Sequence, residues 1–377
     1  MTPENHQKQS RARKIIIITT LSLIGLCLLA VGTSWVTNQF LPTDDEKANE
    51  MSRQDIARAE EALNLMGELG SQTWTGLGDN LPLIIWNDAY AFLVNAEKQL
   101  EGWDVLDSTE INNLPVFIQE NEANYQAFAE VLPNGRYAGS MATKDAVNIG
   151  FVEMFRENLP PVINQIFPYQ LILLSTDHYI TALVHETFHA YQAENYPARF
   201  QDAEKAYAST DAYESRFPEM SESWQQEIQI LQDAVDAEDL TEKKALAQAF
   251  LDAREQRRSD MNLSATLMRY EKRFEWLEGS AKYVELEIWE NAVDSTDYMP
   301  VESLSLDNDF DSYEGYQNRW KNELTNMENA AKNGGDTLFY YSGMMQERLL
   351  DDLLPGWQTQ MGEAGIWVED LLREALK

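Results

Sequence analysis

Residues 182–191 read ALVHETFHAY, and the rest of the chain can be interpreted around this stretch. On a helix, positions i and i+4 lie one turn apart on the same face, so His185 and His189 can offer two imidazole nitrogens to one metal ion. Glu186 follows the first histidine and can reach a water molecule beside that ion. The flanking residues are uncharged, so the alternative is a pair of core histidines. The H-E-x-x-H spacing favours a metal site with Glu186 as general base.

A catalytic zinc site has three protein ligands and one open position, so a third ligand must come from elsewhere in the chain. No histidine follows His189, which leaves a carboxylate on a second helix. The best candidates lie in residues 274–285, where Glu278 and Glu285 are seven positions apart on one helix face. The small residues after Glu278 would let this helix pack closely against another backbone.

Three elements, in this order, resemble the gluzincin metallopeptidases, especially the aminopeptidase N and leukotriene A4 hydrolase group. They are H-E-x-x-H from His185, E-G-x-A-x-Y-V-E from Glu278, and a tyrosine three residues before Gly343. The resemblance implies that Glu278 is the third zinc ligand. It also implies that the hydroxyl of Tyr340, with Tyr341 as the alternative, stabilises an oxyanion.

The chain differs from this family at three points. Leu277 stands where the family usually has Asn, and Glu278 lies 89 residues after His189, where the family has fewer than 20. The G-x-M-E-N signature that binds a free amino terminus is absent from the sequence. The resemblance therefore covers a zinc core spread over residues 182–345 and does not extend to aminopeptidase specificity.

We therefore expect a zinc-dependent peptidase with one Zn²⁺ per chain, which cleaves a peptide or protein substrate through a metal-activated water. Two alternatives are a gluzincin-like protein acting on a non-peptide substrate and a non-catalytic surface module. Glu285 is a candidate to hold a metal ligand in place. His178 lies seven residues before His185, and it either contacts substrate or is solvated in the first helical turn.

The first forty residues have a different character. Four basic residues precede an uncharged run at 15–36, which is long enough to span a bilayer. The charge distribution predicts a single-pass membrane protein with a cytoplasmic tail at 1–14 and an extracytoplasmic C-terminal region. A cleaved signal, which would give a secreted or periplasmic protein, is the alternative. Cys27 is the only cysteine, so the rest of the chain has no disulfide, which favours a bacterial source.

The formal net charge is −34, which argues against binding to nucleic acid. The predicted fold class is α+β, with an N-terminal membrane helix, a small mixed sheet region and then a mainly helical gluzincin-like catalytic region. After the membrane segment we expect a linker at 37–50, an α+β region at 51–174, and a mainly helical zinc-binding region at 175–377 with a helical insertion at about 199–270.

Local patterns predict individual elements of these regions. Residues 81–86 and 89–94 read as apolar strands, residues 135–151 as a hairpin or two short strands, and residues 171–174 as a short strand. Ser175, Thr176 and Asp177 offer an N-cap for the H-E-x-x-H helix.

Overall fold

The computed structural model describes residues 31–42, 48–363 and 365–377, apart from the side chain of Ser108. The chain divides into two compact units, one of Met1–Lys47 with Thr143–Leu174 and one of Ala48–Ala142 with Ser175–Lys377. The described residues are mostly helical, with one six-stranded mixed sheet. Every candidate site residue lies in the second unit.

The sheet of the second unit has the strand order β3-β4-β2-β1-β6-β5. Strands β1 and β6 are parallel, with Leu83 opposite Gly139, and the other neighbours are antiparallel. One face carries a core that includes Ile84, Leu93 and Phe117. The strands are β1 (Leu83–Trp86), β2 (Tyr90–Val94), β3 (Asp104–Ile111), β4 (Leu114–Glu120), β5 (Phe128–Val131) and β6 (Tyr137–Ala142).

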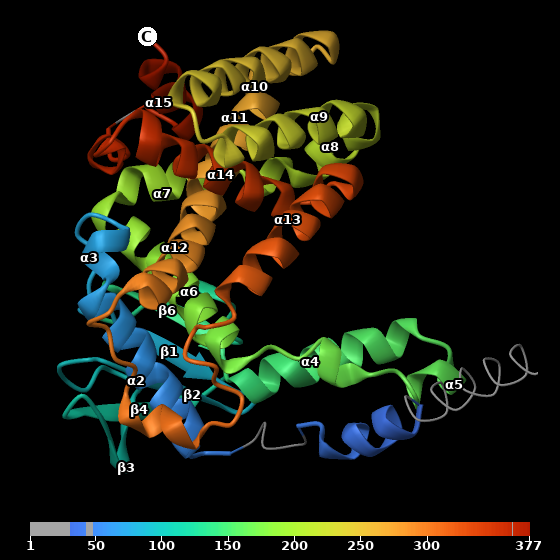
Figure 1. Ribbon diagram of the computed structural model, residues 1–377. Helices are drawn as coiled ribbons and strands as arrows, with labels where there is room; N and C mark the ends of the chain where they lie inside the picture. Colours follow the sequence, from blue (N-terminus) through green and yellow to red (C-terminus); the bar gives the residue numbers. More distant parts are fainter. Residues whose placement is uncertain (1–30, 43–47, 364) are drawn as a thin grey trace, which may run out of the picture. The chain divides into compact units, whose positions relative to one another are not determined.

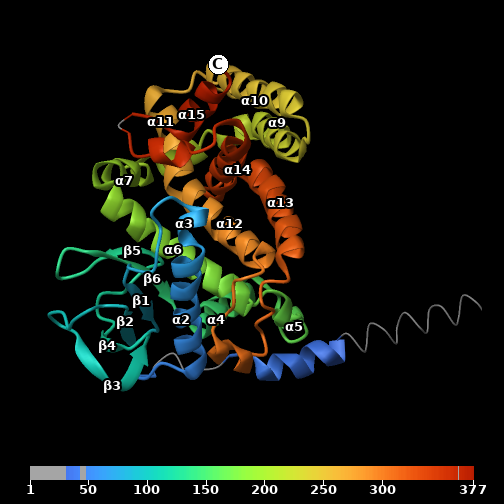
Figure 2. The same ribbon diagram turned by 60° about the vertical axis from the view of Figure 1, so that its left-hand side comes forward.

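Helix α6 crosses the sheet at β6 and β5 and packs against α2, α7 and α12 (Figure 1). Figure 2 shows α9, α10, α11 and α15 gathered at the end of the unit away from the sheet. The helices are α2 (Arg53–Glu68), α3 (Gly70–Thr73), α6 (Thr176–Asn195), α7 (Pro197–Glu204), η4 (Tyr207–Ser209), α8 (Thr210–Glu214), α9 (Phe217–Asp236), α10 (Leu240–Asp260), α11 (Ala265–Phe274), η5 (Glu275–Gly279), α12 (Ser280–Asp294), η6 (Glu302–Leu306), α13 (Tyr316–Asn333), α14 (Thr337–Leu353), η7 (Trp357–Gln360) and α15 (Val368–Ala375).

The first unit is helical where it is described. Its elements are a helix at 31–37, η1 (Asn38–Phe40), α4 (Lys144–Asn158), α5 (Pro161–Asn164) and η3 (Tyr169–Leu171). A small core of Leu41, Val152 and Tyr169 holds these elements together.

Two strand predictions fail over residues of this unit. Of the hairpin or two short strands expected at 135–151, the structure has one strand, β6 of the second unit; helix α4 follows it, because the Thr143 side chain accepts a hydrogen bond from the Ala146 amide and caps a helix there. The strand expected at 171–174 is absent, and η3 and an irregular segment occupy that part of the described chain.

The predicted membrane segment at 15–36 also needs correction. Residues 1–30, which include the tail expected at 1–14, lie outside the described residues. Among the helices that the structure describes, none is both long enough and apolar enough to cross a membrane. This finding contradicts the membrane helix in the predicted fold class and the single-pass membrane location.

Candidate metal site

Helix α6 carries the H-E-x-x-H motif and is fixed at its start and at its middle. The Ser175 side chain accepts a hydrogen bond from the His178 amide at 3.3 Å, so the predicted N-cap is confirmed. Near the motif, a Cβ atom on Gly139 of β6 would overlap Thr187 of α6. Backbone therefore packs against backbone there, and this close approach sets the position of His185 and His189 over the sheet.

The two histidines of α6 are buried, with His185 5% and His189 1% exposed. Nδ1 of His185 lies 3.2 Å from a carboxylate oxygen of Glu285, and Nδ1 of His189 lies 2.9 Å from Oε1 of Gln192. The amide nitrogen of Gln192 donates to the carbonyl oxygen of Trp276 at 2.9 Å, which fixes Oε1 as the acceptor. Both Nδ1 atoms therefore act as donors, so that in the neutral imidazoles each Nε2 atom carries the lone pair that could bind a metal.

Glu278 meets both of these Nε2 atoms. Its Oε2 lies 3.3 Å from Nε2 of His189 and 3.6 Å from Nε2 of His185. Two ligands about 2.05 Å from a tetrahedral zinc ion are roughly 3.3 Å apart, so these spacings match the edges of such a site. Glu186 adds a carboxylate, because ligand atoms of His185, Glu186 and His189 all lie within 4.8 Å of one another.

A local departure from α-helical geometry carries Glu278 to this position. The segment η5 is a π-helical turn between α11 and α12. Such turns insert a residue into a helix and are frequent at functional sites. A Cβ atom on Gly279 would lie 2.6 Å from the Cα atom of Gly343, so η5 and α14 cross with their backbones in contact. The small residues expected after Glu278 serve this crossing.

Tyr340 comes from α14, one turn before the crossing. Its ring stacks on the ring of His185, with centroids 5.7 Å apart and planes 14° apart. Burial raises the pKa of Tyr340, and the nearby carboxylates of Glu278 and Glu186 raise it further. Tyr340 therefore keeps its proton at neutral pH. It can act as a hydrogen-bond donor beside His185, Glu186, His189 and Glu278, which we call the histidine cluster.

Two other tyrosines, Tyr341 and Tyr207, have positions that the sequence did not predict. Tyr341, the alternative to Tyr340, points its hydroxyl to Glu323 at 2.7 Å and does not face the histidines. Tyr207 was not predicted, yet its hydroxyl donates to Oε1 of Glu278 at 2.9 Å. No motif marks Tyr207, because it lies on η4 in the long segment between the two ligand helices.

Glu285, the candidate to hold a metal ligand in place, lies against His185. Its Oε1 accepts from Lys282 at 2.9 Å and from Arg319 at 2.6 Å, and both cations also pair with Glu323. Two cations and two carboxylates thus form a neutral group behind His185. This group fixes the orientation of the His185 imidazole ring.

His178 does not join the histidine cluster. Its Nδ1 lies 2.8 Å from the hydroxyl of Ser175, and its ring packs edge-on against Trp289, with centroids 5.0 Å apart. The side chain is thus part of the N-terminal cap of α6.

The charges of the histidine cluster suit a divalent cation. In the described part of the chain, no Lys or Arg pairs with Glu186 or Glu278, so two carboxylates face the two imidazoles. Burial alone would lower the pKa of His185, but Glu278 and Glu285 outweigh it and raise that pKa to about 10. Burial alone would raise the pKa of Glu278, but His189 and His185 hold it well below its usual range. The carboxylates thus draw positive charge into the site, which a bound cation would supply.

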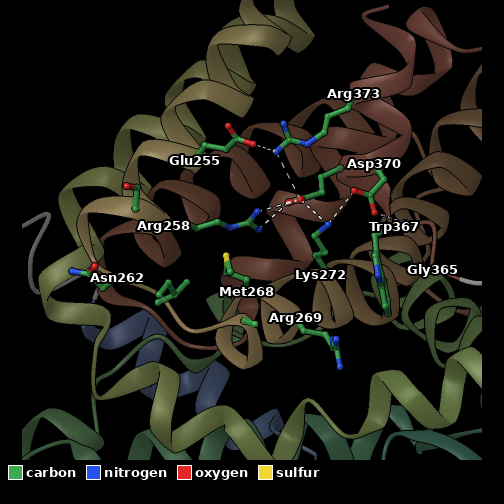
Figure 3. Close-up of a pocket in the computed structure, with 14 residues that line it drawn as sticks. Glu255, Arg258, Asn262, Met268, Arg269, Lys272, Gly365, Trp367, Asp370 and Arg373 are labelled. Atoms are coloured by element: carbon green, nitrogen blue, oxygen red, sulfur yellow. Dashed lines mark hydrogen bonds and ion pairs between the residues drawn. The ribbon is translucent and has the colours of Figure 1, made fainter.

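A cavity of about 1110 Å³ lies elsewhere, lined by residues of α10, α11 and α15 (Figure 3). Its carboxylates are all paired with cations. Lys272 lies 3.0 Å from Asp370, Arg373 lies 2.9 Å from Glu255, and Lys272 also lies 2.8 Å from the buried Glu369. This cavity therefore offers no free carboxylate for chemistry, and the histidine cluster is the better candidate.

Comparison with known proteins gives no relative. No family model matches the chain, and no curated protein or solved structure is significantly similar to it.

Proposed function

We propose that this protein is a gluzincin-like zinc peptidase, with one zinc ion per chain held by His185, His189 and Glu278. One observation carries the proposal. Oε2 of Glu278 approaches Nε2 of both histidines at 3.3 and 3.6 Å, while each Nδ1 is already used. Two imidazoles and a carboxylate are the ligands of many hydrolytic zinc sites.

The remaining residues of the site have roles that fit hydrolysis. A bound zinc ion would act as a Lewis acid toward water and the substrate carbonyl. Glu186 is partly exposed, and burial raises its pKa despite the neighbouring histidines, which suits a group that takes a proton from water and passes it to the leaving amine. The Tyr340 hydroxyl would donate to the oxyanion that develops on the substrate.

The edge of the sheet supports a peptide as the substrate. Strand β5 is the last strand of the sheet, and its Phe128 ring lies with its centroid 4.5 Å from that of His189. An edge strand can pair with an extended peptide through its free backbone groups. A substrate strand added to β5 would run past the histidine cluster.

Residues other than the ligands argue against a purely structural metal. A structural zinc site is closed by four protein ligands. Here Glu186 and Tyr340 are both partly exposed and lie beside the ligand cluster. A base and a hydroxyl donor at the solvent-facing side are what hydrolysis requires.

The test is zinc content and hydrolysis of the full-length protein, beside Glu278→Ala and Glu186→Gln. We expect about one zinc per chain in the parent and in Glu186→Gln, and a clear loss in Glu278→Ala. Glu186→Gln should lose hydrolysis of a peptide panel by at least about 100-fold, because the base is gone. A parent without zinc after reconstitution, or a fully active Glu186→Gln, would refute the proposal. An ester panel run in parallel would detect a non-peptide substrate.

A further inference from the structure

The two oxygens of Glu278 have different surroundings. Oε2 faces the imidazoles of His185 and His189, as described above. Oε1 accepts a hydrogen bond from the hydroxyl of Tyr207 at 2.9 Å. Glu278 is only 2% exposed, so water cannot easily replace this hydroxyl.

Tyr207 reaches the carboxylate from a part of the chain that carries none of the proposed ligands. It opens η4, in the segment between α7 and α8. Its ring packs edge-on against Phe274, with centroids 5.0 Å apart, and Phe274 is the last residue before the π-helical turn that bears Glu278. Tyr207 is 47% exposed, so one side chain extends from solvent to the buried carboxylate.

The roles of the Tyr207 hydroxyl and of the Tyr207 ring can be tested separately. The ring contact with Phe274 would survive replacement by phenylalanine. The hydroxyl donates to Oε1 of Glu278 while Oε2 faces the histidines. Without it the buried Oε1 loses this donor, and the carboxylate is held only by the two histidines and by Tyr340, which also hydrogen-bonds to Glu278.

We propose that Tyr207 is a positioning residue of the metal site, which holds Oε1 of Glu278 so that Oε2 alone is presented to the ion. This inference rests on the proposed function, because it assumes that Glu278 is a metal ligand. It also gives the helical segment between the two motifs a part in the site. Hydrogen bonds that orient metal ligands typically contribute 10–100-fold to metal affinity.

The test compares zinc affinity in three full-length proteins by competition with a chelating indicator. They are the parent, Tyr207→Phe and Tyr316→Phe. Tyr316 is the matched control, because its hydroxyl also donates to a glutamate, Glu290, at 2.6 Å, but on α13 and away from the histidines. Circular dichroism and thermal melting of the metal-free proteins show whether each variant is folded.

We expect Tyr207→Phe to bind zinc about 10- to 100-fold more weakly than the parent, with its metal-free melting temperature unchanged. Tyr316→Phe should bind zinc like the parent. Equal zinc affinity in parent and Tyr207→Phe would overturn this inference and leave the zinc site standing. Equal weakening in both variants would also overturn it, because the effect would then be general. A parent that binds no zinc would overturn the proposed function and this inference together.

Discussion

Two of the places where the second unit buries glutamates differ in how the negative charge is balanced. The first is the histidine cluster on α6. The second, which we call the arginine network, consists of Arg254, Arg257, Arg258 and Lys272 with Glu227, Glu271, Glu275 and Glu369. Four cations and four carboxylates balance in the network. In the histidine cluster, no Lys or Arg of the described residues pairs with Glu186 or Glu278.

We interpret the arginine network as a structural use of buried charge and, on the proposed function, the histidine cluster as a functional one. Arg257 touches Glu227 at 3.2 Å and Glu271 at 2.6 Å, with no exposed surface on any of the three side chains. Such a network is complete within the protein. On the proposed function, a cation from outside completes the histidine cluster, so the properties of the cluster should depend on metal and on pH where those of the network do not.

The largest expected effect comes from breaking the network. Arg257→Ala leaves Glu227 and Glu271 with fewer partners in a buried place, and this should lower the free energy of unfolding by about 3–5 kcal/mol. Urea unfolding with zinc and with chelator should give the same loss. A loss below about 1 kcal/mol, or one that appears with zinc alone, would contradict the comparison.

Metal should have the next largest effect, confined to the cluster. Zinc at 100 times its dissociation constant should stabilise the parent by about 2.7 kcal/mol. Thermal melting with and without zinc measures this gain. Arg257→Ala should show the same gain as the parent, and Glu278→Ala should show none. An equal gain in Glu278→Ala would mean that zinc binds elsewhere.

The smallest effect, counted per pH unit, is the pH dependence of zinc binding. Without metal, the pKa of His185 is raised from its ordinary value of 6.5 to about 10. The bound proton therefore stabilises the fold fully at pH values below 6.5, and this stabilisation is lost as the pH rises toward 10. A zinc ligand must be neutral imidazole, so binding releases that proton. Zinc affinity should therefore rise about tenfold, or about 1.4 kcal/mol, per pH unit between pH 7 and pH 9. Competition titrations at three pH values measure the slope. A flat profile would show that His185 is already neutral.

The sequence predicts the elements that local spacing determines. The H-E-x-x-H helix with its Ser175 cap follows from helical periodicity and capping chemistry. The helical insertion expected at about 199–270 contains α9 and α10. The residues alone leave Glu278 and Glu285 as candidates, and it is the resemblance to the gluzincin motif that implies Glu278 beside the histidines.

Other features depend on tertiary contacts that local patterns do not encode. The π-helical turn at Glu275–Gly279 exists where η5 crosses α14, and nothing in its composition marks it. Tyr207 reaches Glu278 only because the intervening helices fold back. The region at 144–151 contains β-branched residues that suggest a strand, but the cap at Thr143 starts a helix there.

The glycine contact between η5 and α14 also has a consequence for motion. At the contact between Gly279 and Gly343 no side chain separates the two backbones, and the hydroxyl of Ser342 on α14 donates to Glu275 on η5 across the same crossing. We therefore expect Glu278 and Tyr340 to move together. An opening of the site would then occur along the boundary with α6, so that a carboxylate and a hydroxyl leave the histidines together.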